Sequence, residues 1–107
     1  MSKAIFKLHA EIFRVLSNPL RHEIFHRLAE REMTVSELVE ACDAKKSNVS
    51  QHLSLLSTYK LVESRKEGKN VYFSVSYPEL AQACQLIDTI LKDQLRKDYN
   101  LFEGGVV

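Results

Sequence analysis

The residues of this chain that could do chemistry are concentrated between Asp43 and Asn70. This segment carries six basic residues against three acidic ones, a local charge of +3, whereas the rest of the chain sums to −2. Ser, Asn and Gln residues lie between the lysines, and their hydroxyl and amide groups can hydrogen-bond base edges while the cations contact phosphates. No nucleophile–base pair, paired acids or phosphate-binding loop emerges, so we expect a nucleic-acid-binding protein and not an enzyme.

Two helices separated by a tight turn are predicted to carry the polar part of this segment. The pattern predicts a short helix from Thr34 to about Ala41, the turn Cys42-Asp43-Ala44, and a longer helix from Lys46 to Tyr59. The buried face of the longer helix is expected to hold Val49, Leu53 and Leu56. Its opposite face carries Ser47, Asn48, Ser50, Gln51 and Ser54. Such residues weaken an isolated helix, so this face is expected to hydrogen-bond a partner.

A basic β-hairpin is predicted to follow the longer helix. The segments Leu61–Lys66 and Asn70–Ser76 have strand composition, and apolar and polar residues alternate in the second. Gly68 supplies the turn, because glycine adopts positive φ without strain. A helix and a hairpin side by side form a surface that fits duplex DNA.

Three further helices are predicted outside this segment, over Ala4–Leu16, Pro19–Glu30 with Asn18 as its N-cap, and Pro78–Asp98. The last helix has a broad apolar face built on Leu80, Cys84, Ile87 and Leu91. One small domain does not easily cover so much apolar surface, so we expect a dimer joined through the terminal helices. The alternative is that this face packs back on its own domain.

The fold class is therefore mainly α with a small β-hairpin, in the order helix-helix-helix-helix-hairpin-helix. We expect residues 1–98 to form one winged helix-turn-helix domain for DNA binding and dimerisation, and residues 99–107 to form a short mobile tail. The composition, 45% apolar and 27% charged, is typical of a soluble globular protein. No apolar run approaches the roughly 18 residues of a membrane span. The N-terminus lacks a signal-peptide cleavage site, and two cysteines are too few for a disulfide framework, so we expect a cytoplasmic protein.

The residues expected to contact DNA fall into two groups. In the major groove we expect Ser47, Asn48, Ser50, Gln51 and His52. Against the phosphates we expect Lys45 and Lys46 at the helix start. On the hairpin we expect Arg65, Lys66 and Lys69 to hold flanking phosphates or to enter the minor groove. For His52, a hydrogen bond inside the domain is an equally good interpretation.

The order of the elements, with SNVSQHLSLL in the polar helix and RKEGKNVYFSV in the hairpin, resembles the ArsR/SmtB family of small dimeric winged-helix repressors. The similarity extends from LSNPLRHEIFHRL to the last helix. It implies a homodimer joined by its terminal helices, with help from the first helix, whose recognition helices enter successive major grooves of a palindromic operator.

The chain departs from the family pattern at the turn and at the start of the recognition helix. Cys42-Asp43 stands where Leu-Gly is usual, although Asp tolerates a left-handed turn better than most residues. Lys45 stands where Ser or Thr usually caps the recognition helix, so Asp43 or Ser47 could take over capping and shift the helix start.

The resemblance also implies positions for metal ligands, and the ligands are missing there. The cysteine site of the third helix corresponds to Thr34 and Ser36, which offer no thiolate. The Asp/His/His/Glu site of the terminal helices corresponds to Tyr77, Glu79, Ile90 and Asp93, where no imidazole remains. We therefore expect no metal and no cofactor at the usual sites, and the effector is unknown.

A pair of histidines is the other candidate for metal binding. His22 and His26 lie one helical turn apart. The buried positions Leu20, Ile24 and Leu28 are expected to turn them outward, as exposed side chains with no special role.

Two alternative functions remain open. Cys84, on the apolar face of the last helix, or Cys42, at the turn, could make the protein a thiol-responsive repressor, although Cys42 has the environment of a small buried apolar residue. A winged helix could also serve as a protein-interaction module without DNA binding, and the basic hairpin argues against that interpretation.

Overall fold

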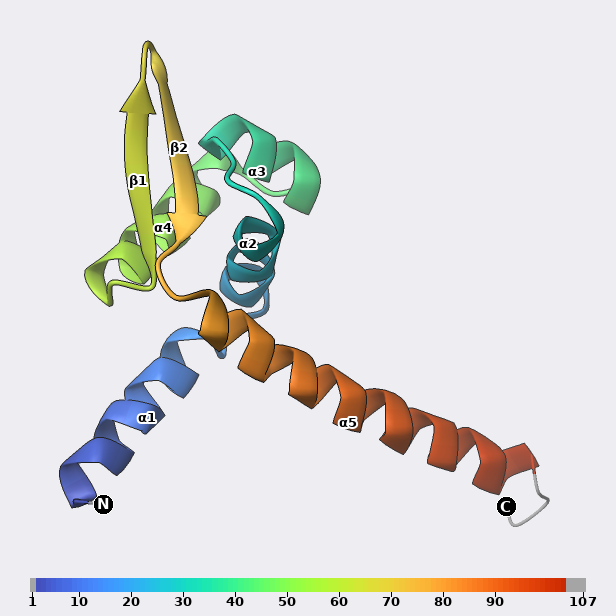
Figure 1. Cartoon of the computed structure of the whole chain (residues 1–107). Coiled ribbons are helices and arrows are strands. Elements are labelled where there is room, and N and C mark those ends of the chain that lie inside the picture. Colours follow the sequence, from blue (N-terminus) through green and yellow to red (C-terminus); the bar gives the residue numbers. More distant parts are fainter. Residues whose placement is uncertain (1, 104–107) are drawn as a thin grey trace. The chain divides into compact units, whose positions relative to one another are not determined.

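The computed structural model describes residues 2–103, with side chains described as far as residue 99. Its elements are α1 (Lys3–Val15), α2 (Pro19–Glu30), α3 (Val35–Cys42), α4 (Lys46–Thr58), β1 (Val62–Glu67), β2 (Asn70–Val75) and α5 (Pro78–Glu103) (Figure 1). The chain divides into two compact units, one that ends at Tyr77 and one that begins at Pro78 and consists of α5. The predicted fold class is confirmed, with four helices, a hairpin and a last helix in the expected order.

Local hydrogen bonds set where α2 and α3 begin. The Asn18 side chain accepts a hydrogen bond of 2.9 Å from the backbone N–H of Arg21, and Pro19 occupies the first turn. Thr34 and Glu37 form a reciprocal capping box, in which the Thr34 hydroxyl accepts from the Glu37 N–H at 3.2 Å and the Glu37 carboxylate accepts from the Thr34 N–H at 2.9 Å. Each such cap is worth about 1 kcal/mol, which explains why both starts could be predicted from sequence.

The core of the first unit is formed where α1 ends and where α2, α3 and α4 face one another. Its side chains with no exposed surface are Val15, Ile24, Phe25, Leu38, Val49 and Leu56. The predicted buried face of α4 is confirmed, because Leu53 is buried as well. Leu20 was expected to be buried and is half-buried, and Leu8 on α1 is exposed. Helix α2 is the central element, in contact with α3, α4 and β2.

The α3–α4 turn adopts the left-handed conformation that the sequence allowed. Asp43 has φ 50° and ψ 52°, and it ends α3 as its C-cap residue. Lys45 is the N-cap of α4 and no side chain caps this helix, so neither of the expected substitutes takes that role. The helix still begins at Lys46, as predicted.

The hairpin stands beside α3 and α4 and has a third strand-like partner (Figure 1). Strands β1 and β2 pair antiparallel from Val62 opposite Val75 to Glu67 opposite Asn70, and Gly68 turns with φ 60°. Met33, in the α2–α3 linker, exchanges two backbone hydrogen bonds with Phe73, of 3.1 and 2.8 Å. The sequence analysis did not predict this bridge, which ties the hairpin to the linker.

Helix α5 is longer than predicted. It was expected to end near Asp98 and continues to Glu103, and residues 104–107 of the predicted tail lie outside the described residues. Its exposed apolar side chains include Leu86, Ile87, Ile90, Leu91 and Leu95. Within residues 2–103, no helix combines the length and the apolar character that crossing a membrane requires.

Candidate nucleic-acid interface

One face of α4 is polar and exposed. Val49, Leu53 and Leu56 anchor the helix in the core. The opposite side chains Ser47, Asn48, Ser50 and Gln51 are all exposed, as predicted. Among the described residues, no hydrogen bond from another side chain occupies these groups. Hydroxyl and amide groups presented in this way on a rigid helix can hydrogen-bond the base edges of a major groove.

The N-terminal end of α4 favours anions. Lys45 and Lys46 are exposed, and no side chain among the described residues caps the first backbone N–H groups of the helix. Free N–H groups and the positive end of the helix dipole attract phosphate oxygens, and two ammonium groups add to this attraction. A helix start without a side-chain cap therefore suits contact with a DNA backbone.

His52 is held inside the domain. Its Nδ1 lies 3.2 Å from a guanidinium nitrogen of Arg21, so the ring links α4 to α2. Arg21 also donates to the backbone carbonyl of Val15. Burial, and secondarily the charge of Arg21, hold the pKa of His52 below its usual value. Of the two roles considered for His52, the intramolecular hydrogen bond is the one that the structure shows.

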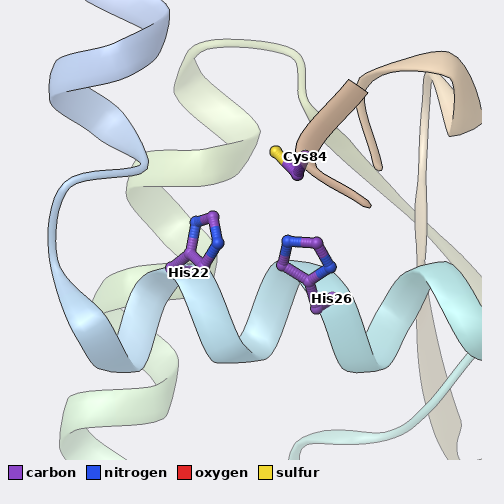
Figure 2. A group of neighbouring side chains, drawn as sticks. All are labelled: His22, His26 and Cys84. Carbon is purple, nitrogen blue, oxygen red and sulfur yellow. The ribbon is translucent and has the colours of Figure 1, made fainter. Parts of the chain in front are cut away.

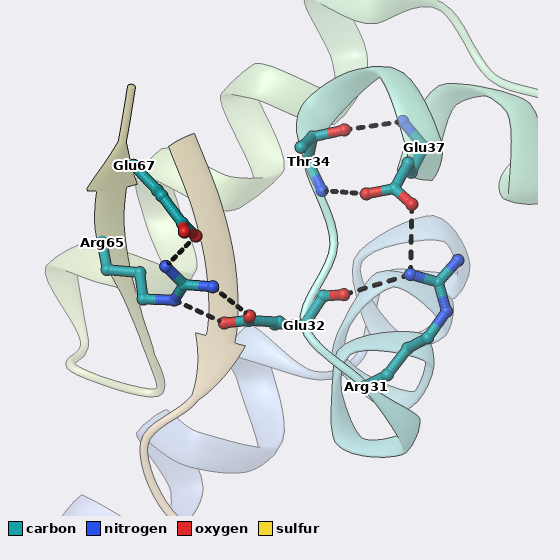
Figure 3. Close-up of polar contacts among 6 residues, drawn as sticks. All are labelled: Arg31, Glu32, Thr34, Glu37, Arg65 and Glu67. Atoms are coloured by element: carbon teal, nitrogen blue, oxygen red, sulfur yellow. Dashed lines mark hydrogen bonds and ion pairs between the residues drawn. The ribbon is translucent and has the colours of Figure 1, made fainter. Parts of the chain in front are cut away.

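Arg65 of the wing is engaged by two carboxylates. Its guanidinium donates to both oxygens of Glu32, with Nε at 3.0 Å, and to Glu67 at 2.7 Å (Figure 3). The same guanidinium lies 4.8 Å from the centre of the Tyr72 ring. The hydrogen bonds from Arg65 hold the pKa of Glu32 below its ordinary value. Sequence reasoning grouped Arg65 with the phosphate contacts and missed this partner, because Glu32 lies 33 residues away in the chain. Arg65 thus joins the wing to the α2–α3 linker.

The linker is itself held at the start of α3. Arg31 donates to the carbonyl of Glu32 at 3.2 Å and to the carboxylate of Glu37 at 3.1 Å (Figure 3). The backbone N–H of Thr34, and then Arg31, hold the pKa of Glu37 below its usual value. A chain of contacts therefore runs from the wing through the linker to the helix-turn-helix, and it fixes the wing relative to α3.

The remaining basic side chains of the wing are uncompensated. Lys66 and Lys69 are exposed. Neither makes an ion pair with any residue in the described part of the chain. With Lys45 and Lys46 they provide four ammonium groups in the first unit that are available to phosphates.

The positions corresponding to the usual metal ligands have other partners or none. Thr34 caps α3, and Ser36 is exposed. On α5, Asp93 pairs with Arg96 at 2.7 Å and with Lys97 at 3.1 Å.

Both thiols are less acidic than an ordinary cysteine. Burial, followed by the nearby Glu23, raises the pKa of Cys42 at the end of α3. Burial, followed by the charge of Asp88, raises the pKa of Cys84. Since the thiolate is the reactive form, these shifts disfavour thiol reactivity near neutral pH.

Comparisons with known proteins agree with this geometry. A family model described as a helix-turn-helix domain matches residues 16–65. The chain is 31% identical, over 97% of its length and 96% of the relative, to the HTH-type transcriptional regulator Rv0081 of Mycobacterium tuberculosis. The crystal structure of Rv0081 matches with a TM-score of 0.79 at 30% identity, over 92% of this chain and 99% of that one.

Two further relatives are informative. The homodimeric winged helix-turn-helix DNA-binding domain Mb0332 of Mycobacterium bovis, a possible ArsR-family regulator, matches with a TM-score of 0.78 at 25% identity, over 91% of this chain and 93% of that one. The transcriptional repressor SmtB homolog of Synechocystis is 37% identical over 67 residues, which cover 63% of this chain and 51% of that protein.

Proposed function

Because the chain belongs to the ArsR/SmtB family of winged helix-turn-helix transcriptional regulators, we propose that it is a cytoplasmic repressor that binds a palindromic operator as a homodimer. The observation that carries this proposal is the exposed polar face of α4 beside a wing whose two lysines are unpaired. In this role Asn48 and Gln51 hydrogen-bond base edges, and Ser47 and Ser50 contact bases or phosphates.

The phosphate contacts come from two places in the first unit, the start of α4 and the wing. Lys45 and Lys46 contact the backbone at the start of α4, and Lys66 and Lys69 contact it from the wing. Arg65 acts by holding the wing in place through Glu32, because its charge is already compensated. His52 supports α4 from behind through Arg21.

The exposed apolar face of α5 supports the homodimer. Leu86, Ile87, Ile90, Leu91 and Leu95 are between 49% and 69% exposed, and they recur at helical spacing. A continuous exposed apolar surface of this kind marks an interaction site, and a second copy supplies a matching surface around a twofold axis. The homodimeric state of Mb0332 supports the same arrangement. A twofold dimer presents two copies of α4. Each copy binds one half-site of the operator, and the two half-sites are spaced by one turn of DNA, about 34–36 Å.

Regulation requires a signal that distinguishes two states of the dimer. An effector releases DNA only if it binds the DNA-incompetent dimer more tightly than the competent one. The positions that usually hold metal ligands lack Cys and His in this chain, so they do not indicate which effector it binds.

Selection of DNA from a pool of random duplexes tests the proposal. We expect a palindromic consensus, which is then used in fluorescence anisotropy titrations with wild-type protein and single variants. Gln51→Ala and Asn48→Ala are each expected to lose about 1–3 kcal/mol of discrimination per base contact and to relax the preference at one position of each half-site.

Ser57→Ala, at the exposed C-terminal end of α4, is the matched control and is expected to keep the wild-type affinity. Failure to select any sequence, together with a binding affinity that does not change with salt, would refute DNA binding and favour the protein-interaction alternative.

A further inference from the structure

Two histidines on α2 are more enclosed than the sequence suggested. His22 and His26 were expected to be exposed, yet both are half-buried. Their rings rise from the same side of the helix with centroids 4.5 Å apart and planes inclined by 55° (Figure 2).

One nitrogen of this pair lacks a partner. The Nδ1 atom of His22 is buried and has no hydrogen-bond partner among the described residues. A buried polar atom without a partner costs about 1–3 kcal/mol, so a group of this kind calls for an explanation. A buried imidazole nitrogen can be satisfied by a protein group, by water or by a metal ion, and no described protein group takes that place at His22.

The spacing of the two imidazoles is that of a chelating pair. The segment His22-Glu23-Ile24-Phe25-His26 places two imidazoles at i and i+4 on one face of a helix, the arrangement in which helical H-E-x-x-H segments hold zinc. We propose that His22 and His26 are two ligands of a site for a divalent first-row transition metal of the zinc type. The site requires no DNA, so it stands apart from the proposed function.

The acidic residue within this segment has a different partner. Glu23 forms an ion pair with Arg27 at 2.9 Å, and a hydrogen bond from the Arg27 Nε reaches the same carboxylate oxygen. In metallopeptidases the corresponding carboxylate is the general base, whereas here it is bound to a guanidinium. The two histidines therefore support metal binding and not peptide hydrolysis.

Titration of wild-type protein with Co²⁺ and Zn²⁺, after treatment with EDTA, tests the site. We expect saturation at one ion per chain and visible Co²⁺ bands that Zn²⁺ abolishes. A sulfur-to-cobalt band would identify one of the two cysteines as a further ligand, and Cys42→Ser and Cys84→Ser variants then assign it.

Substitution of single histidines locates the ion. His22→Gln and His26→Gln are each expected to weaken Zn²⁺ binding at least about 100-fold, since even outer-shell changes at metal sites typically cost 10- to 100-fold. The matched control is His9→Gln, an exposed histidine on α1, which is expected to keep the wild-type affinity.

A second measurement uses only the wild-type protein, so it does not depend on whether the histidine variants fold. In side-chain NMR spectra, one equivalent of Zn²⁺ is expected to shift the imidazole signals of His22 and His26 and to leave those of His9 in place. Wild-type affinity in either histidine variant, or imidazole shifts confined to His9, would overturn the proposal.

Discussion

The count of unpaired lysines makes a quantitative prediction for the salt dependence of DNA binding. Lys45, Lys46, Lys66 and Lys69 are exposed and unpaired in each protomer, whereas Arg65 is compensated by two carboxylates. A dimer therefore offers eight phosphate contacts, and at about 0.9 released counterions per phosphate the slope of log K against log salt is about −7.

Lys69→Gln removes two of these contacts from the dimer and makes the slope shallower by about 2. Between about 50 and 200 mM salt, wild-type affinity is expected to fall about 2 × 10⁴-fold and that of the variant about 2 × 10³-fold. Fluorescence anisotropy titrations on one fixed duplex at five salt concentrations measure both slopes.

Lys7→Gln, at an exposed lysine of α1 outside the proposed interface, is the control and is expected to keep the wild-type slope. An unchanged slope for Lys69→Gln would refute the assignment of the wing to phosphates. A larger loss of slope for Arg65→Gln than for Lys69→Gln would refute the argument that the two carboxylates remove Arg65 from the count.

Three further changes probe the elements that position this surface. Thr34→Ala removes the hydroxyl that caps α3 and is expected to lower the unfolding free energy by about 1 kcal/mol in urea titrations, whereas the exposed neighbour variant Ser36→Ala is not; equal losses would contradict the capping argument. Burial and a neighbouring guanidinium depress the pKa of His52, so its contribution to stability is complete above its unfolded pKa of about 6.5 and is lost as the pH falls further. His52→Asn should therefore flatten the dependence of unfolding free energy on pH between about 7 and 5, and a curve parallel to the wild type would contradict this. Glu32→Gln weakens the link between the wing and the α2–α3 linker, and we expect faster hydrogen exchange at the β1 and β2 amides than in Glu30→Gln, the exposed control; identical protection in both would show that the backbone bridge alone holds the wing.

The positions of the elements were predictable because the signals that set them are local. Asn18 caps α2 through the N–H three residues ahead, and Thr34 and Glu37 cap each other across the same distance. Asp43 could be assigned to a left-handed turn from its residue type alone. The end of α5 was predicted too early, since no Gly or Pro near Asp98 marks a stop and the helix continues to Glu103.

The roles of individual side chains in the candidate interface were harder to predict. The exposed polar face of α4 followed from the spacing of its buried residues. The sequence left two roles open for His52 and gave Arg65 only a contact with DNA, and their hydrogen-bond partners, Arg21 and Glu32, lie 31 and 33 residues away. No periodicity reports a pairing at that separation.

The sequence by itself determined the family, the order of the elements and the exposed polar face of α4, because each depends on residue types and on spacing within a few helical turns. Only the tertiary structure decided which cations remain free for phosphates and how His22 and His26 are enclosed. The physical reason is that burial and ion pairing depend on which elements pack together, and α2, with the linker that follows it, brings together groups that the chain keeps far apart.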